Sequence, residues 1–311
     1  MSGGVGAARL LSGLIQVTDP SNVAAIVNVG DDTVFHGLTV CPDLDTITYT
    51  LAGAVNPDTG WGLAGETWAA LESLRRHAAA NDRPDVGWFS LGDLDLGTHL
   101  WRTQRLAEGA RLTEVTAEIS RTFGLGLRLL PATDDQLRTK VTTPDGATLS
   151  FQEYFVREHH DVDVASVRFV GAMDARPTAE VVAALRQAAV VVIAPSNPVI
   201  SVGPVLAVPG IERALVDRRD SVIAVSPIVG GEALKGPAAR LMADLGEEAS
   251  VVGVARRYAA FARALVIDPV DAHLADAVAE AGMEPIVAPS IMDTPERAAA
   301  LARTCLTGHA P

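Results

Sequence analysis

The chain has 311 residues, of which 48% are hydrophobic and only 5% aromatic, and its formal net charge is −13. This composition is that of a globular protein, and its apolar runs are far shorter than the roughly 20 residues that cross a bilayer. The acidic balance, without a cluster of Lys and Arg, argues against binding to a nucleic acid backbone. Cys41 and Cys305 are too few for a disulfide framework, and we expect a cytoplasmic protein.

Apolar β-branched runs alternate with helical patterns along the chain, which is typical of parallel strands joined by crossover helices. We therefore predict an α/β, doubly wound, Rossmann-like fold with a mostly parallel sheet. The predicted core strands are residues 23–29, 86–91, 189–194, 221–225, 264–267 and 285–288. The predicted helices include residues 64–80, 271–281 and 294–305.

Residues 65–170 depart from this alternation. Their first part has an almost entirely helical pattern, and their second part reads as short extended segments around a turn at 144–146. We interpret 65–170 as a helical and short-strand subdomain inserted into a core formed by 1–64 and 171–311. The sequence contains no repeat or low-complexity linker, so we expect one domain over 1–311.

A glycine-rich loop, Gly3-Gly4-Val5-Gly6, opens a predicted helix that runs to about Gln16. Glycine lets a phosphate approach the amides at the positive end of a helix, and Arg9 adds a charge one turn in. A glycine-rich helix start is as often only a tight packing turn, so this motif alone leaves both interpretations open. Such a loop normally follows a buried strand, whereas here it comes directly after Met1, and we expect the native chain to start upstream.

Carboxylates follow the first predicted strand, where ligands bind in a doubly wound fold. Asp31 and Asp32 come at its end, and Asp43 and Asp45 precede a helix expected to begin near Ile47. Aspartates in glycine and proline turns suit a Mg²⁺ that bridges phosphate oxygens, and we predict Asp31, Asp32 and Asp45 as its ligands. Asp43 is interpreted only as a helix cap, and solvated turns are the alternative for Asp31 and Asp32.

A third polar segment follows the most hydrophobic strand. Ser196 and Asn197 stand between two prolines, and Ser201 follows. A rigid turn of this kind offers the hydroxyl, amide and backbone donors that a diphosphate or ribose needs. A purely structural turn explains the prolines equally well, but not the clustering of polar donors.

A further group of polar residues precedes and enters the helix expected after the glycine at 92. Asp93 and Asp95, with His99 and Arg102 on that helix, could line a pocket for an acceptor substrate.

Together these segments resemble the CofD/FbiA family, the 2-phospho-L-lactate and phosphoenolpyruvate transferases of coenzyme F-420 biosynthesis. The resemblance covers nearly the whole chain and keeps the family's order of motifs. The segments that carry it are residues 3–9, 28–32, 36–38, 41–46, 91–93, 129–135, 151–153 and 194–198. The chain departs from the family in lacking a strand before the glycine loop and in having Ala7-Ala8 where a second glycine is usual.

The resemblance implies a homodimer, dependence on Mg²⁺, and two substrates. One substrate is the deazaflavin Fo, and the other is a guanosine diphosphate that carries lactate, enolpyruvate or glycerate. The ribityl hydroxyl of Fo would attack the phosphorus that bears the acid, releasing GMP and leaving a phosphodiester. The sequence does not specify which acid the donor carries.

The family pattern and the motifs together assign residues to three roles. Asp45 and Asp32 are the predicted catalytic carboxylates, with Asp45 orienting the attacking hydroxyl. Thr46, Asp93 and Arg102 are predicted to lie by the deazaflavin. The nucleotide's phosphates are assigned to Gly3, Gly4, Val5, Gly6, Arg9, Ser196, Asn197 and Ser201.

Two other functions compete with the transferase. A noncatalytic regulator of the YvcK type, which binds a nucleotide sugar on a related fold, would need phosphate donors but no deazaflavin pocket. The segments 42–46 and 92–95 favour the transferase over this regulator. An NAD-dependent dehydrogenase is disfavoured because the strand ending at Val29 lacks the acid that holds a ribose.

Overall fold

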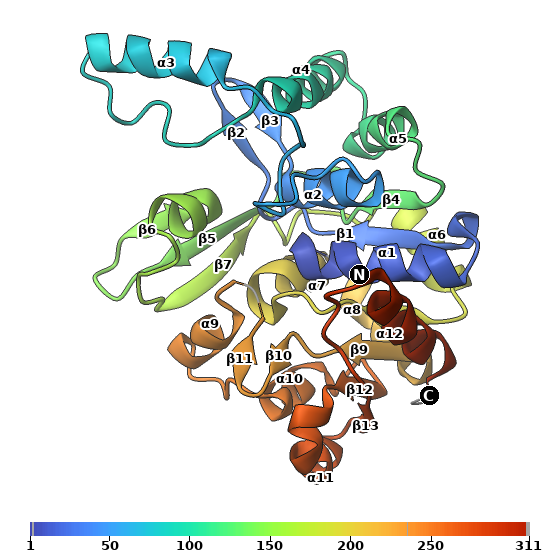
Figure 1. Ribbon diagram of the computed structural model, residues 1–311. Helices are drawn as coiled ribbons and strands as arrows, with labels where there is room; N and C mark the ends of the chain where they lie inside the picture. Colours follow the sequence, from blue (N-terminus) through green and yellow to red (C-terminus); the bar gives the residue numbers. More distant parts are fainter. Residues whose placement is uncertain (2, 235, 309–311) are drawn as a thin grey trace.

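The parallel strands of the protein form two groups in the computed structural model, which describes residues 1, 3–234 and 236–308 (Figure 1). A four-stranded parallel sheet has the order β13-β12-β9-β8. Its strands are β8 (Val191–Ile193), β9 (Val222–Val225), β12 (Ala264–Ile267) and β13 (Glu284–Val287). A second parallel pair joins β1 (Ala24–Val27) to β4 (Arg128–Pro131). The predicted α/β fold with mostly parallel strands is confirmed.

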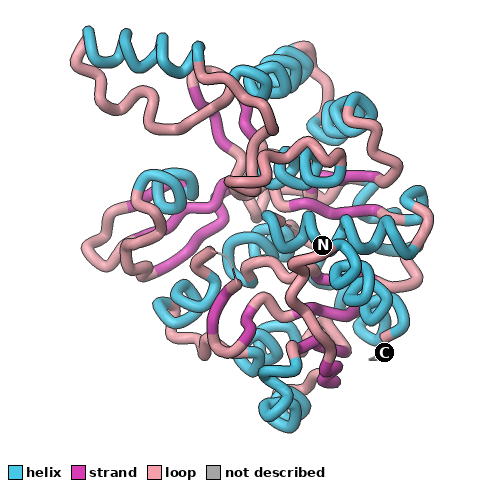
Figure 2. Tube along the Cα trace, viewed as in Figure 1, coloured by secondary structure: helices cyan, strands magenta, loops and turns pink. Residues whose placement is uncertain are grey.

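Every side chain of β9 and β12 is buried. Continuous apolar runs of this kind are typical of parallel strands that are covered on both faces, and helices lie around the strands in Figure 2. These helices are α1 (Gly4–Val17), α2 (Pro42–Leu51), α6 (Ala179–Gln187), α7 (Gly203–Ala207), α8 (Ile211–Val216), α9 (Ala238–Asp244), α10 (Val251–Tyr258), α11 (Ala275–Glu280) and α12 (Pro295–Thr307). No helix in the described ranges has both the length and the apolar character to span a membrane.

Helices α1 and α12 pack against each other at very short range. A Cβ atom at Gly13 would lie only 2.2 Å from the carbonyl oxygen of Ala298, so the two backbones approach as closely as a glycine allows. Thr294 caps α12, because its hydroxyl accepts a hydrogen bond from the amide of Arg297. The packing of α12 holds α1, and with it the glycine loop, against the sheet.

The region 65–170 begins with three helices, α3 (Ala69–Ala80), α4 (Asp93–Ala107) and α5 (Leu112–Thr122), as its pattern predicts. It ends with an antiparallel sheet of order β6-β5-β7. These strands are β5 (Arg138–Thr142), β6 (Thr148–Ser150) and β7 (Ser166–Val170), and the predicted turn between β5 and β6 contains Gly146 at φ 89°. Strand β4 lies between the two parts and pairs with β1, so this region also contributes one strand to the parallel core.

Two small antiparallel hairpins complete the strands. The first, β2 (Thr33–Phe35) with β3 (Leu38–Val40), leads away from the end of β1 toward α3 and α4 (Figure 1). The second, β10 (Ile228–Val229) with β11 (Glu232–Ala233), follows β9. Both hairpins therefore begin just beyond the carboxyl end of a parallel strand.

Several predicted elements are corrected by the structure. Residues 86–91 form a loop rather than a strand, because aromatic side chains there contact one another and the backbone joins no ladder. Helix α2 begins at Pro42 instead of near Ile47, since proline is well suited to the first helical turn. Helix α3 begins at Ala69 rather than at residue 64, and the helix predicted over 271–281 is a 3₁₀ turn (Pro269–Leu274) followed by α11.

Candidate active site

The glycine loop and the polar turn after β8 lie against each other. The Ser196 hydroxyl donates to the carbonyl of Gly3 at 2.8 Å and also accepts from its amide at 3.3 Å. A Cβ atom at Gly6 would lie 2.3 Å from the carbonyl oxygen of Pro195, so only glycine fits there. Ser201 also lies close to the loop, because a Cβ atom placed on Gly3 would lie 2.9 Å from the Cβ atom of Ser201. The structure thus brings together the two segments predicted to hold phosphates.

The Asn197 side chain stabilises the polar turn by hydrogen bonds to its backbone. Its Oδ1 accepts from the amides of Val199 and Ile200 at 2.9 and 3.2 Å. Its Nδ2 is buried and meets no acceptor among the described residues. A buried amide donor without an acceptor costs free energy, which a bound anion would recover.

The other residues of the predicted phosphate group differ in exposure. Gly4 is the first residue of α1, whose positive end can stabilise an anion, and Val5 and Gly6 follow in the same turn. Arg9 is exposed, and its Nη1 donates to the carbonyl oxygen of Met292 at 3.4 Å. Whether any of these residues holds a phosphate stays a prediction.

Four buried aspartates follow β1 or lie in the first turn of α2, and we call Asp31, Asp32, Asp43 and Asp45 the acidic cluster; Asp43 is the member that contacts the glycine loop. All four are at most 8% exposed. The solvated turns considered for Asp31 and Asp32 are therefore ruled out. Burial raises the pKa of Asp32 to about 7, and burial together with the Asp43 carboxylate raises the pKa of Asp31 well above its ordinary value.

The first two aspartates of the cluster lack partners for one oxygen each. Oδ1 of Asp31 and Oδ1 of Asp32 accept no hydrogen bond from any residue that the structure describes. The other oxygen of Asp32 accepts from the Cys41 thiol at 3.1 Å. Buried carboxylates without a donor are neutralised by a proton or by a cation, and oxygen ligands are those that Mg²⁺ prefers. Asp31 and Asp32 therefore have the chemistry to hold Mg²⁺.

The interpretation of Asp43 as a helix cap is wrong, because Cys41 is the N-cap residue of α2 and no side chain among the described residues caps this helix. Asp43 lies in the first turn of α2, and its Oδ1 accepts from the amide of Gly4 at 2.8 Å, across the gap to α1. Its Oδ2 accepts from the Asn28 side chain at 2.9 Å. Burial raises the pKa of Asp43 to about 6. Sequence reasoning missed this link because nothing in the pattern shows that Asp43 and the glycine loop meet.

Asp45 faces α4 rather than its sequence neighbours. Both of its oxygens accept from the Arg102 guanidinium, with Nη1 3.1 Å from Oδ2, and the two residues are 5% and 1% exposed. Arg102 Nη1 also lies 3.2 Å from His99 Nδ1. A bidentate, buried pair of this kind fixes the carboxylate in one orientation.

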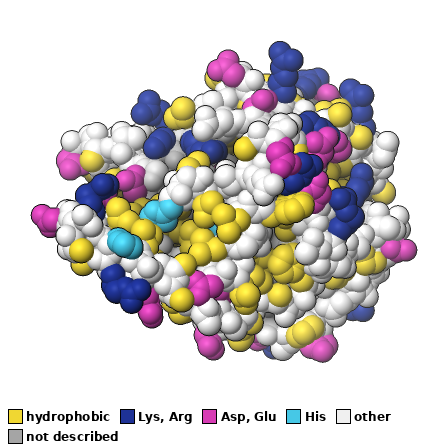
Figure 3. All heavy atoms as spheres, turned by 90° about the horizontal axis from the view of Figure 1, so that it is seen from above, with side chains coloured by type: hydrophobic (Ala, Val, Ile, Leu, Met, Phe, Trp, Pro, Cys, Tyr) yellow, Lys and Arg dark blue, Asp and Glu magenta, His cyan; other side chains and the backbone are white. Residues whose placement is uncertain are grey.

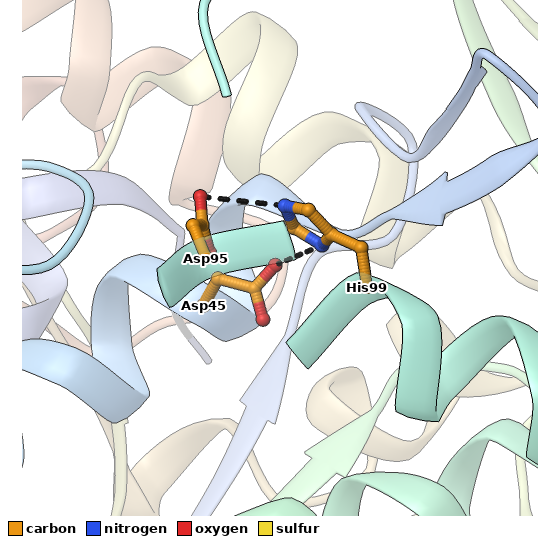
Figure 4. Close-up of side chains that lie close together, drawn as sticks. All are labelled: Asp45, Asp95 and His99. Carbon is orange, nitrogen blue, oxygen red and sulfur yellow. Dashed lines mark ion pairs between the residues drawn. The ribbon is translucent and has the colours of Figure 1, made fainter. Parts of the chain in front are cut away.

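His99 and Asp95 continue this network (Figure 4). His99 Nε2 lies 3.3 Å from Asp95 Oδ2, and Nδ1 lies 3.8 Å from Asp45 Oδ2. Tyr49 donates to the other oxygen of Asp95 at 2.5 Å. Within the described ranges, one group of three potential metal ligands has its ligand atoms within 4.8 Å of one another, namely Asp45, Asp95 and His99. Asp45 therefore does not form the predicted metal site together with Asp31 and Asp32. The reason is that α2 starts early and directs Asp45 toward α4.

The remaining predicted acceptor residues have different surroundings. Thr46 is half-buried on α2, next to Asp45. Asp93 accepts from the amides of Ala69 and Ala70 at 3.0 and 3.1 Å and so caps α3. The Thr67 hydroxyl and these two amides hold the pKa of Asp93 below its ordinary value. A role of Thr46 or Asp93 toward an acceptor stays a prediction.

Comparison with known proteins identifies sequence relatives over nearly the whole chain. The family model described as 2-phospho-L-lactate transferase CofD matches residues 1–301. A phosphoenolpyruvate transferase of Nocardia farcinica is 41% identical over 310 residues, which cover 98% of this chain and 92% of the relative. A phosphoenolpyruvate transferase of Mycobacterium avium is 44% identical over 282 residues, which cover 83% of this chain and 82% of the relative.

Two solved structures of BH3568 from Bacillus halodurans are similar in fold. One has a TM-score of 0.62 at 18% identity and covers 98% of this chain and 97% of its own. The other, described as a member of the upf0052 family, has a TM-score of 0.60 at 18% identity, with coverage of 98% and 96%. At this identity they show the α/β fold alone. The family match and the sequence relatives together show that this chain belongs to the 2-phospho-L-lactate transferase CofD family.

Proposed function

We propose that the protein transfers a phospho-carboxylic acid from a guanosine diphosphate donor to the ribityl hydroxyl of the deazaflavin Fo, releasing GMP, in coenzyme F-420 biosynthesis. The relatives named phosphoenolpyruvate transferase favour enolpyruvate as the acid, with lactate and glycerate as the alternatives. The product is a phosphodiester between Fo and the acid.

One observation supports this proposal above the others. The amide end of α1 and the polar turn after β8 offer donors to an anion, and the acidic cluster beside them offers unpartnered carboxylate oxygens to a cation. A diphosphate bound together with Mg²⁺ needs both kinds of group side by side. A binding site for a nucleotide alone would have no use for the buried carboxylates.

On the donor side, we assign Ser196, Asn197 and the α1 amides other than that of Gly4 to the diphosphate, because the Gly4 amide already donates to Asp43. The free Nδ2 of Asn197 and the helix end would stabilise the charge that GMP carries away. When bound, Mg²⁺ supplies charge neutralisation at the phosphate oxygens, and Asp31 and Asp32 are the residues that would hold it.

On the acceptor side, we assign Asp45 to the attacking hydroxyl. Arg102 holds the Asp45 carboxylate in a fixed position, which suits a group that orients a hydroxyl by hydrogen bonding. The hydroxyl oxygen forms the new bond to the phosphorus bearing the acid, and the bond from that phosphorus to the GMP oxygen breaks. The hydroxyl proton passes to Asp45 and then to solvent.

Incubation with Fo, Mg²⁺ and each of the lactyl, enolpyruvyl and glyceryl guanosine diphosphates tests the proposal. We expect release of GMP and a new phosphodiester of Fo by mass spectrometry, with the enolpyruvyl donor preferred. Tight nucleotide binding by the folded protein without product from any donor would instead favour the regulator of the YvcK type.

We also propose a homodimer, as the family resemblance implies. Light scattering after size-exclusion chromatography tests this directly, because the chain mass of 32.5 kDa separates monomer from dimer.

A further inference from the structure

Three aromatic rings contact one another at the far end of the β2–β3 hairpin. Phe35 stacks on Phe89 with ring centroids 4.0 Å apart and an interplanar angle of 13°. Trp88 meets both rings edge-on, at 5.2 Å from Phe35 and 5.7 Å from Phe89. We call Phe35, Trp88 and Phe89 the ring cluster. It joins the hairpin to the loop that precedes α4.

The ring cluster is connected to the candidate active site by the hairpin itself. Asp32 of the acidic cluster immediately precedes β2. On the returning strand, the amide of Thr39 donates to the Thr103 hydroxyl at 2.8 Å, and the carbonyl of Thr39 accepts from Arg102 Nη1 at 3.3 Å. Arg102 in turn holds Asp45. The hairpin is therefore fixed to the same helix that fixes the predicted catalytic carboxylate.

The rings are not part of the buried core. All three members of the ring cluster are half-buried. Aromatic residues make up only 5% of the chain, so three of them in contact at one place are a distinct feature. The next residue, His36, is exposed in a left-handed conformation at φ 53°, which ends the strand. Seen from above, hydrophobic side chains gather in patches on the surface of the molecule (Figure 3). Half-exposed stacked rings are suited to bind another planar ring.

We propose that the ring cluster binds the planar tricyclic ring of the acceptor by stacking, while its ribityl chain extends along the hairpin toward the acidic cluster. This inference rests on the proposed function. Phe35 lies three residues after Asp32 along an extended segment, a span of about 10 Å. A ribityl chain reaches about 9 Å from its terminal hydroxyl to the ring centre with ordinary bond lengths. The terminal hydroxyl can thus lie at the acidic cluster while the tricyclic ring lies at the ring cluster.

The alternative is that the rings only anchor the loop before α4. Leucine at position 35 or 89 preserves apolar contact but removes the stacking face, whereas Phe89→Tyr preserves the ring. A matched control is Phe155→Leu, because Phe155 belongs to another stacked pair, with Phe151 at 5.3 Å, which the proposal does not involve.

The test measures the dissociation constant of Fo by spectral titration, together with steady-state kinetics in both substrates. We expect Phe35→Leu and Phe89→Leu to weaken Fo binding and raise its KM about tenfold, as loss of a stacking partner does for nucleobases. The KM of the donor and the unfolding temperature should stay near those of the wild type. Phe155→Leu should bind Fo like the wild type, and Phe89→Tyr, which keeps the ring, should regain most of the affinity lost in Phe89→Leu.

Fo affinity unchanged in both leucine variants would overturn the inference, while product formation by the wild type would leave the proposed function intact. Equal loss of donor and acceptor binding, or a lowered unfolding temperature, would show the anchoring role instead. Wild-type protein that binds Fo through these rings but forms no product would overturn the function and retain the ring site.

Discussion

Replacing Asp32 by Asn removes one buried negative charge and tests why the acidic cluster needs a cation. Asp32 is 5% exposed, and its pKa lies at about 7 instead of the ordinary 3.8 because of burial. This difference corresponds to about 4 kcal/mol of free energy of unfolding, which is an upper figure since the structure can relax around the charge. The new amide must also find an acceptor, at a cost of about 1–3 kcal/mol.

Proton binding by Asp32 determines how the stability changes with pH. Between pH 4 and 7 the folded protein holds a proton on Asp32 that the unfolded chain has released, so stability falls as the pH rises through this range. The contribution is fully present below pH 4 and lost above pH 7. Without added metal, Asp32→Asn should therefore lose less stability than the wild type between pH 5 and pH 8. At pH 8 we expect the variant to be more stable by about 1–3 kcal/mol.

Urea unfolding at pH 5 and pH 8, with EDTA or with Mg²⁺, measures both effects. Mg²⁺ should stabilise the wild type at pH 8, since an ion that binds only the folded state adds to its stability, and should stabilise Asp32→Asn much less. The control is Asp58→Asn, which changes the same charge at an exposed loop position. A wild type with the same stability at both pH values and no response to Mg²⁺ would show that Asp32 is neither strained by burial nor a metal ligand.

Four further predictions concern the residues around the two proposed substrate sites. Arg102→Met should destabilise the fold by about 3–5 kcal/mol because it leaves Asp45 charged and buried, and adding Asp45→Asn should restore much of this in thermal unfolding. Asp45→Asn alone should lower kcat strongly at saturating Mg²⁺, and near-normal turnover would remove Asp45 from catalysis. Gly6→Ala should abolish donor binding in calorimetry through its contact with the β8 turn, whereas Gly97→Ala, with open space around it, should not. Asn197→Ala should raise the donor's KM about tenfold, and an unchanged KM would exclude its amide from the diphosphate site.

The strands and helices with strong patterns were predictable from sequence. In the predicted strands 221–225 and 264–267, residues 222–225 and 264–267 are apolar throughout, and burial on both faces is their simplest explanation. Residues 86–91 are also mostly apolar, yet they form a loop, because their largest side chains are rings that contact Phe35 on a distant hairpin. A local pattern cannot distinguish these two outcomes, since it does not contain the partner.

The candidate site also has features that were predictable from the sequence and features that were not. Residues that follow parallel strands, such as Asp31 and Ser196, were predicted to gather because the carboxyl ends of such strands share one edge. The direction of side chains on α2 was not predictable, because it depends on the helix beginning at Pro42 rather than near Ile47. An early start turns Asp45 to Arg102 and Asp43 to the glycine loop.

The position of Asp43 explains why the two halves of the site depend on each other. Its carboxylate accepts from the Gly4 amide, which is the place at the end of α1 where an anion is most stable. It also accepts from Asn28, whose own Oδ1 accepts from the Gly30 amide, so one side chain joins α1, α2 and the end of β1. A diphosphate cannot take the Gly4 amide as well and has to bind beside it, toward Asn197. Two anions at one helix end repel each other, and a cation held by the neighbouring aspartates offsets that repulsion. Under the proposed function, the buried carboxylates would therefore make the amide end of α1 selective for a phosphate that arrives with its metal.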